Sequence, residues 1–267
     1  MTMNFNADAY ATARSASQST FMQKLCGASI PFYLRLILKT ILPSSRRAKK
    51  GRYSREVWIR DSFNILGYLE RVGVRFHIEG MDHMRSVAEP VVFIGNHMST
   101  LETFILPCLI EPLKTCTFVV KEELMNYPVF GPIMRAVQPI AVSRTNPKED
   151  FMKVMDEGTQ RLRDGMSVII FPQTTRTTMF QPDDFNSLGI KLARRAGVPI
   201  LPIAMKTDAW GNGKRIRDFG KIDPSKIVHI SFGKAMQIAG RGQEEHAATI
   251  SFIEKHLARW SGESHSH

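Results

Sequence analysis

The stretch VVFIGNHMSTLETFILPCLI, Val91 to Ile110, sets the pattern that the rest of the chain follows. Val91 to Gly95 is continuously apolar, which is typical of a strand buried on both faces of a sheet. A polar break then leads into an apolar run that is typical of a helix, with Glu102 near its start. A histidine at the end of a buried strand, with an acid five residues later, is typical of an acid/base pair. His97 and Glu102 are therefore the first candidate site residues.

Glu102 has two compatible roles. On an ideal helix, residues five apart lie about 140° apart, so His97 and Glu102 can meet only if His97 precedes the helix. The sequence Ser99 to Glu102 also reads as a capping box, with Ser99 as the N-cap, in which the carboxylate satisfies backbone N–H groups. The same geometry turns the carboxylate back toward His97, where it could hold Nδ1–H and leave Nε2 as a base. The chain has no GxSxG elbow, which argues against a covalent serine intermediate.

From residue 74 onward the chain alternates between strand-like and helix-like segments. Strands are predicted at 74–79, 91–95, 115–120, 140–142, 167–171, 198–205 and 227–232. Helices are predicted after Asn146, which Pro147 and Glu149 follow at favoured capping positions, at 183–196, and around 250–260. Residues 74–267 are therefore expected to form one α/β domain with a mostly parallel central sheet flanked by helices.

The first 73 residues have a different character. Residues 1–20 are polar and are predicted to be poorly ordered. Residues 21–73 are predicted to form a helical hairpin that sits at the membrane. Its apolar part, Ser29 to Leu42, is shorter than the ~20 residues of a transmembrane span. The basic sequence RRAKKGR follows, and an apolar helix beside a basic cluster is typical of an interfacial anchor. The alternative is a buried helix followed by a solvated basic loop.

Composition narrows the function classes. The net charge of +11 in 267 residues indicates an anionic partner, which could be a nucleic acid, a phosphate-bearing substrate or a membrane surface. Nucleic acid is disfavoured because the basic cluster is not interleaved with aromatic residues. Three cysteines without CxxC spacing argue against a disulfide framework or a zinc ribbon and suit a reducing compartment. The chain has no GxGxxG or GxxxxGK fingerprint, and its histidines lack metal-ligand spacing, so no metal site is expected.

Basic residues follow several of the predicted strands. Lys121 follows the strand at 115–120, Arg144 follows 140–142, and the segment 172–177 follows 167–171. Ligands of α/β sheets gather at the carboxyl ends of the strands, so these residues are expected to face one site together with His97. A phosphate held beside a general base fits that arrangement.

At these residues the chain resembles the glycerolipid acyltransferases, the lysophosphatidic acid acyltransferase family. Five segments resemble the family's motifs in order: Asn96-His97 with Glu102 (NHxxxxD), Val120–Leu124 (K-x-E-L), Pro139–Arg144 (an apolar strand ending in arginine), Phe171–Thr177 (FPEGTRS) and Gly197–Ala204 (V-P-I-x-P). The match covers roughly residues 75–235.

The resemblance implies transfer of a fatty acyl group from acyl-CoA or acyl carrier protein to the free hydroxyl of a lysophospholipid, converting lysophosphatidic acid to phosphatidic acid. No metal or redox cofactor is implied. By resemblance, His97 is the general base oriented by Glu102, and Arg144 and Arg176 bind the acceptor phosphate. The other implied substrate-binding residues are Asn96, Lys121, Gln173, Thr174 and Thr175. The expected location is the cytoplasmic face of the cell membrane, peripheral or monotopic, on an anionic surface.

Three positions depart from the family pattern. Glu102 stands in place of aspartate, Gln173 in place of glutamate and Thr174 in place of glycine. A β-branched residue is costly where a glycine adopts positive φ or allows close approach, so the acceptor pocket is expected to be reshaped. The same chemistry on a different lipid acceptor therefore stays open, as does a non-catalytic lipid-binding homologue.

Overall fold

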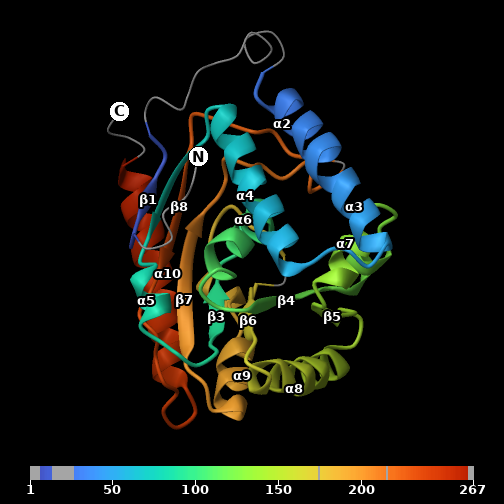
Figure 1. Cartoon of the computed structure of the whole chain (residues 1–267). Coiled ribbons are helices and arrows are strands. Elements are labelled where there is room, and N and C mark those ends of the chain that lie inside the picture. Colours follow the sequence, from blue (N-terminus) through green and yellow to red (C-terminus); the bar gives the residue numbers. More distant parts are fainter. Residues whose placement is uncertain (1–6, 14–26, 174, 215, 264–267) are drawn as a thin grey trace.

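A computed structural model describes residues 7–13, 27–173, 175–214 and 216–263. Within these ranges the strands form one eight-stranded sheet with helices on both faces (Figure 1). The strands are β1 (Tyr10–Ala11), β2 (Arg75–Glu79), β3 (Val92–Gly95), β4 (Cys116–Lys121), β5 (Ile140–Val142), β6 (Ser167–Ile170), β7 (Ile200–Lys206) and β8 (Ile227–Phe232). Their order across the sheet is β1-β2-β8-β7-β3-β6-β4-β5.

Most neighbouring strands in this sheet are parallel. Strands β7, β3, β6, β4 and β5 all run in one direction, whereas β8 is antiparallel to β7, and β1 is antiparallel to β2. The predicted α/β fold with a mostly parallel sheet flanked by helices is thus confirmed. As a consequence, the carboxyl ends of five strands lie along the same edge of the sheet, where their following loops converge.

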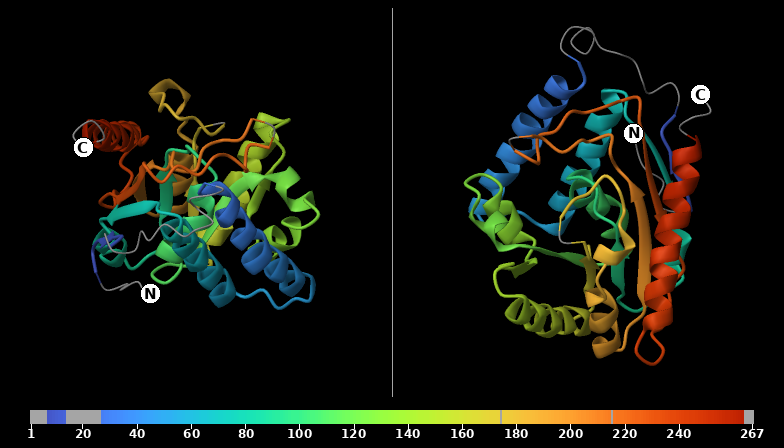
Figure 2. Two further views of the ribbon diagram at one scale, coloured as in Figure 1. Left: turned by 90° about the horizontal axis from the view of Figure 1, so that it is seen from above. Right: turned by 180° about the vertical axis from the view of Figure 1, so that it is seen from behind.

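Two hydrophobic cores lie on opposite faces of the sheet. Along β3, Phe93 points into one core, and Val92 and Ile94 point into the other. The first face is covered by α2 (Ser29–Arg35), η2 (Leu36–Ile41), α4 (Arg55–Arg71) and α6 (Leu101–Ile110), and the second by α8 (Pro147–Arg163), α9 (Leu188–Ala196) and α10 (Gln243–Glu263). Figure 2 shows the blue N-terminal helices and the red α10 on opposite sides of the sheet. The remaining short elements are α3 (Leu42–Lys49), α5 (Asp82–Arg85), η3 (Glu122–Asn126), α7 (Gly131–Ala136) and η4 (Pro182–Asp184).

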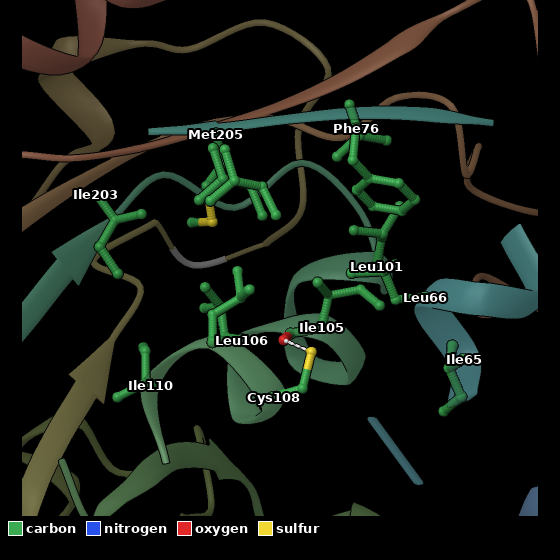
Figure 3. Packing of buried hydrophobic residues seen from close by; sticks show 14 of the residues in the cluster. Ile65, Leu66, Phe76, Leu101, Ile105, Leu106, Cys108, Ile110, Ile203 and Met205 are labelled. Carbon is green, nitrogen blue, oxygen red and sulfur yellow. Dashed lines mark hydrogen bonds between the residues drawn. The ribbon is translucent and has the colours of Figure 1, made fainter. Parts of the chain in front are cut away.

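Helix α6 is buried except at Thr103 and Phe104, which are partly exposed. Leu101, Ile105 and Leu106 are completely inaccessible to solvent, and Figure 3 shows them with Ile203 and Met205 of β7. A helix that is apolar all round must be buried, and packing between α4 and the sheet satisfies this requirement. Because Glu102 lies in the first turn of this helix, the fold carries a carboxylate into the core.

The N-terminal helical segment runs without interruption from residue 29 to 49. Pro43 has no N–H to donate into the preceding turn, and the wider π-helical turn of η2 lies directly before it. Phe32 and Leu36 point into the core. Helix α4 then follows, beginning at an N-cap, Ser54, whose side chain accepts from the N–H of Val57. No helix in the described ranges is both long and apolar enough to cross a membrane.

Two local predictions differ from the structure. Of residues 1–20, predicted to be poorly ordered, only 7–13 are among the described residues; within them Tyr10 pairs with Ile78 as a strand, and its hydroxyl donates to Glu70 at 2.6 Å. The helix predicted at 183–196 begins only at Leu188, whose N–H donates to the Asn186 side chain at 2.9 Å, and the start of the predicted range belongs to the separate short helix η4. The prediction for α8 is confirmed, with Asn146 as its N-cap.

Candidate active site

His97 lies two residues beyond the end of β3. The preceding Asn96 is buried, and its side-chain amide donates to the Met205 carbonyl at 2.7 Å and accepts from the Met205 N–H at 2.8 Å. Asn96 therefore continues the pairing of β3 with β7 through its side chain. Its predicted contact with substrate finds no support here, since the side chain faces β7 and lies outside the pocket described below. By holding on to β7, the Asn96 side chain fixes the point at which the chain leaves the sheet and therefore the position of His97, the next residue.

The imidazole of His97 is held from two sides. Its Nδ1 lies 2.8 Å from Oε2 of Glu102. Its ring stacks on Phe171 with centroids 4.5 Å apart and an interplanar angle of 6°. The backbone is fixed as well, because His97 N–H donates to Gln173 Oε1 at 2.8 Å and its carbonyl accepts from Thr177 N–H at 2.9 Å. With Nδ1 directed at the carboxylate, Nε2 is the ring nitrogen left to act on a substrate.

Glu102 is completely buried and surrounded by hydrogen-bond donors. Its Oε1 accepts from the N–H groups of Met98 at 3.1 Å and Ser99 at 2.9 Å, and from the hydroxyl of Thr207. An ionised carboxylate has no proton to donate and only accepts hydrogen bonds, and every neighbour named here is a donor. Both expected contacts of Glu102, with the backbone and with His97, are present together. The helix boundary falls one residue later than predicted, with Thr100 rather than Ser99 at the N-cap position.

A basic pocket opens beside His97. Its walls include most of the residues that the sequence placed at the strand ends: Lys121, Arg144, Gln173, Thr175 and Arg176. Thr174 lies outside the described residues. Lys121 pairs with Glu123 at 2.6 Å, and Arg176 pairs with Asp218 at 2.8 Å. The convergence of parallel strand ends thus brings a histidine–carboxylate pair and several cations to one pocket.

Comparison with known proteins shows the family of the chain. A family model described as Acyltransferase matches residues 75–206. A 1-acyl-sn-glycerol-3-phosphate acyltransferase from Pseudomonas aeruginosa is 30% identical over 233 residues, covering 86% of this chain and 82% of that protein. The chain belongs to the glycerolipid acyltransferase family. This acyltransferase is also 29% identical over 143 residues to a 1-acyl-sn-glycerol-3-phosphate acyltransferase from Cocos nucifera, covering 52% of this chain and 45% of that protein.

The fold of this acyltransferase also matches a solved structure. The crystal structure of the 1-acyl-sn-glycerophosphate (LPA) acyltransferase PlsC from Thermotoga maritima superimposes with a TM-score of 0.64 and covers 90% of this chain and 95% of that one. The sequence identity is 18%, so this likeness concerns the fold alone.

Arg144 of the acyltransferase sits in an unusual backbone conformation. Its φ is 62°, in the left-handed region that costs a non-glycine residue roughly 1–2 kcal/mol. Asp150 in the first turn of α8 supports this conformation, because its carboxylate accepts from the N–H groups of Ser143 at 2.8 Å and Arg144 at 2.7 Å. Strained residues concentrate at functional sites, and here the strain sets the point from which an arginine enters the pocket.

Sequence reasoning missed three residues that take part in this site. Thr207 donates to Glu102, and Arg217 and Asp218 line the pocket. All three lie in the connection between β7 and β8. The sequence of this connection shows no strand or helix periodicity and no motif. The available signal was position: this connection follows a predicted strand, and a parallel strand delivers its loop to the same edge of the sheet as His97.

An apolar cavity adjoins the basic pocket. It has a volume of about 90 Å³ and lies between the N-terminal helices, α6 and the strand β4. Thr103, Phe118, Val120 and Leu124 line both spaces, so the cavity borders directly on the pocket that contains His97. Its other walls are mainly apolar, including Ile41, Trp58, Ile65, Phe104, Phe130, Ile133 and Met134. The predominantly apolar lining suits an apolar group rather than a charged one.

Proposed function

We propose that this acyltransferase moves a fatty acyl group from a thioester donor, acyl-CoA or acyl carrier protein, to the free hydroxyl of 1-acyl-sn-glycerol 3-phosphate, forming phosphatidic acid. The observation that carries the proposal is the contact of His97 Nδ1 with the buried Glu102, on the wall of a pocket that also contains Arg144 and Arg176. The relatives from Pseudomonas aeruginosa and Cocos nucifera carry the name of this activity.

The proposed chemistry needs one base. In this proposal Glu102 accepts a hydrogen bond from the Nδ1–H of His97, so Nε2 takes the proton of the acceptor hydroxyl as that oxygen attacks the thioester carbonyl. The C–O bond forms, the C–S bond breaks, and the leaving thiolate takes the proton back from the imidazolium. The stack of His97 on Phe171 keeps the ring in one plane through both transfers. A thioester is already activated, so the reaction needs no metal or redox cofactor.

The cations of the pocket supply the acceptor site in this proposal. Arg144 and Arg176 come from the ends of different strands and line the same pocket as His97, with Lys121 beside them. Guanidinium groups bind phosphate oxygens with two parallel hydrogen bonds, which fixes orientation as well as charge. Holding the phosphate in this way presents the nearby hydroxyl of the glycerol backbone to His97.

The apolar cavity is the proposed place for the fatty acyl chain. It borders the pocket at Phe118 and Val120, so a thioester carbonyl at His97 could extend its chain between α4 and α6. Burying the chain there removes apolar area from water at about 25 cal/mol per Å². The donor's polar part would then remain on the open side of the pocket.

The N-terminal helix supplies a proposed membrane contact. Ile30, Leu34 and Leu38 are spaced four residues apart and are 51%, 46% and 57% exposed. They form one apolar stripe, and the basic sequence 46–52 begins on the same helical segment and continues past its end at Lys49. Exposed apolar stripes mark interaction sites, and each Lys or Arg near an anionic leaflet adds roughly 1 kcal/mol. We therefore place the protein on an anionic membrane surface, at the cytoplasmic face.

Vesicle flotation tests the membrane contact. Changing the three residues of the stripe to serine, I30S/L34S/L38S, should reduce binding to phosphatidylglycerol vesicles by more than tenfold, since each side chain adds on the order of 1 kcal/mol when buried in lipid. Met152→Ser on α8, which is 47% exposed on the opposite face of the sheet, is the control and should bind normally. Unchanged binding of the triple variant would mean that another surface holds the membrane.

A lysolipid panel tests the acceptor. Purified protein is incubated with labelled acyl-CoA or labelled acyl carrier protein and with lysophosphatidate, lysophosphatidylethanolamine or lysophosphatidylglycerol, and the products are separated by thin-layer chromatography. We expect phosphatidic acid as the main product. Activity with another lysolipid and none with lysophosphatidate would overturn the acceptor assignment, and inactivity with every lysolipid would favour a non-catalytic lipid-binding protein.

A further inference from the structure

The segment from Gly211 to Lys221, between β7 and β8, closes one side of the basic pocket. It is anchored to the loop after β3, because the Asn212 side chain donates to the Met98 carbonyl at 3.0 Å. It is also anchored to the N-terminal helix, since the Tyr33 hydroxyl donates to the Gly220 carbonyl at 2.6 Å. These two hydrogen bonds hold the segment against both the loop after β3 and helix α2.

Glycines allow the two arms of this segment to approach closely. The N–H of Gly211 donates to the Lys221 carbonyl at 2.9 Å, and the N–H of Gly213 donates to the Arg217 carbonyl at 3.1 Å. A Cβ on Gly220 would lie 1.6 Å from the Gly211 carbonyl oxygen, so no other residue fits there without rearrangement. These close contacts between the two arms fix the positions from which Arg217 and Asp218 extend their side chains.

Asp218 directly follows the Gly213–Arg217 pair and contacts Arg176. Its Oδ1 is 2.8 Å from Nη1 of Arg176 and accepts from the Thr100 hydroxyl at 3.0 Å. Arg176 Nη1 also contacts the Thr100 hydroxyl. The Asp218 carbonyl is fixed in turn by the indole N–H of Trp210 at 3.1 Å. The side chain of Arg176 is therefore held from the β7–β8 connection and the start of α6 together.

Arg217 lies beside this pair. Its Nη1 is 3.4 Å from the Thr175 hydroxyl, and its Nη2 is 3.3 Å from the Arg176 carbonyl, so the guanidinium rests on the segment that follows β6. Within the described part of the chain, Arg217 has no carboxylate within ion-pair distance. The two carboxylates that line the pocket are those of Glu123 and Asp218, which pair with Lys121 and Arg176.

We propose that Arg217 is a further acceptor-binding residue and that Asp218 is a positioning residue that sets the side chain of Arg176. The proposal rests on the proposed function, because it gives the acceptor phosphate an additional partner. A phosphate that meets Arg176 also meets the negative charge of Asp218, and the guanidinium of Arg217 next to it offsets that charge. Arginine rather than lysine suits the position because its planar fork can hold two phosphate oxygens while resting on the backbone.

The neighbours of Arg217 indicate where this phosphate would lie. Ile216 and Phe219 are 60% and 50% exposed on either side of Arg217 and Asp218. The ring of Phe219 lies 5.2 Å from that of Tyr33 on α2, the helix that bears the exposed stripe. Ile216 and Phe219 therefore lie between the apolar stripe and the basic pocket, so a lipid held at the stripe would bring its phosphate toward Arg217.

Steady-state kinetics of three variants test Arg217. Arg217→Gln should raise the KM for lysophosphatidate about ten- to hundredfold, the value of one or two hydrogen bonds to a charged group, while kcat and the KM for acyl-CoA change little. Arg217→Lys should restore part of the loss, since it keeps the charge. Lys214→Gln removes the same charge from the same segment but outside the pocket, and it should match the wild type. An unchanged acceptor KM in Arg217→Gln would overturn this assignment.

A double-mutant cycle tests Asp218. Asp218→Ala should raise the acceptor KM, and Asp218→Asn, which keeps an oxygen for Arg176, should recover most of the loss. In the background of Arg176→Gln, Asp218→Ala should no longer raise the acceptor KM, because its unfavourable effect acts through that arginine. Additive effects would overturn the positioning role. If the wild type is active on lysophosphatidate but these variants fail the predictions, only this inference falls; if the wild type is inactive on lysophosphatidate, the proposed function and this inference fall together.

Discussion

Replacing Glu102 with glutamine tests how the His97 pair works, because the change removes a charge and almost no volume. In the structure, Oε1 of Glu102 accepts from the N–H groups of Met98 and Ser99 and from the Thr207 hydroxyl, while Oε2 faces His97 Nδ1. The glutamine oxygen must remain with the three donors, so its NH₂ group faces His97. Two donors cannot bond each other, and the ring is expected to change to the tautomer that carries its proton on Nε2.

The size of the effect follows from this tautomer. With a proton on Nε2, His97 has no lone pair to offer the acceptor hydroxyl. The corresponding aspartate-to-asparagine change in the serine protease triad lowers kcat by on the order of 10⁴, and we expect a loss of about 10³ to 10⁴ here. The acceptor KM should change little, because Arg144 and Arg176 are untouched. The lost charge-assisted hydrogen bonds should lower the free energy of unfolding by about 1–3 kcal/mol.

The assay is release of free thiol from acyl-CoA in the presence of lysophosphatidate, followed with a thiol reagent. Glu122→Gln is the matched control, since it makes the same chemical change at an exposed position outside the pocket, and it should leave kcat unchanged. Circular dichroism verifies that both variants are folded. A kcat for Glu102→Gln within threefold of the wild type would refute the argument that Glu102 sets the tautomer of His97.

Three further predictions concern stability and are measured by urea unfolding at 25 °C. Gly80→Ala should lower the free energy of unfolding by more than ~2 kcal/mol, because Gly80 has φ of 80° and a Cβ there would lie 2.2 Å from the Phe232 carbonyl oxygen; a neutral effect would contradict the geometry. Leu106→Ala removes a fully buried side chain and should cost about 2–5 kcal/mol, and a cost below 1 kcal/mol would mean that α6 repacks. Burial, followed by nearby positive charges, lowers the pKa of His229 to about 4, below the ~6.5 of the unfolded chain. Between these two pH values His229 binds a proton in the unfolded state but not in the native state, so the free energy of unfolding should decrease as the pH drops from about 6.5 to 4. His229→Gln should show a smaller decrease, and an equal decrease would contradict the assignment.

The sequence predicted the parts of the site that depend on strand ends. Runs of buried apolar residues mark the strands, and a parallel sheet brings the ends of β3, β4, β5 and β6 to one edge. This is why His97, Lys121, Arg144 and Arg176 could be expected together before any coordinates, and the structure places them in one pocket.

The contacts of Asn96, Thr207, Arg217 and Asp218 could not be predicted in the same way. The family resemblance implied a substrate-binding role for Asn96, whereas in the structure its amide completes the pairing of β3 with β7, a contact that depends on which strands are neighbours. Thr207 and Asp218 meet residues more than 100 positions earlier in the chain. Contacts of such separation depend on the path of a loop, and a loop has no periodicity from which to read that path.

The most direct test of the account is the rate at which purified His97→Ala forms phosphatidic acid from lysophosphatidate and labelled acyl-CoA. The control is His246→Ala, which removes an imidazole that packs against Phe185 on the other face of the sheet. The account predicts that His97→Ala remains folded and loses at least 10³-fold in kcat, at the upper end of what a general base and its orientation contribute, while His246→Ala keeps its activity. Formation of phosphatidic acid by His97→Ala at the wild-type rate would contradict the account.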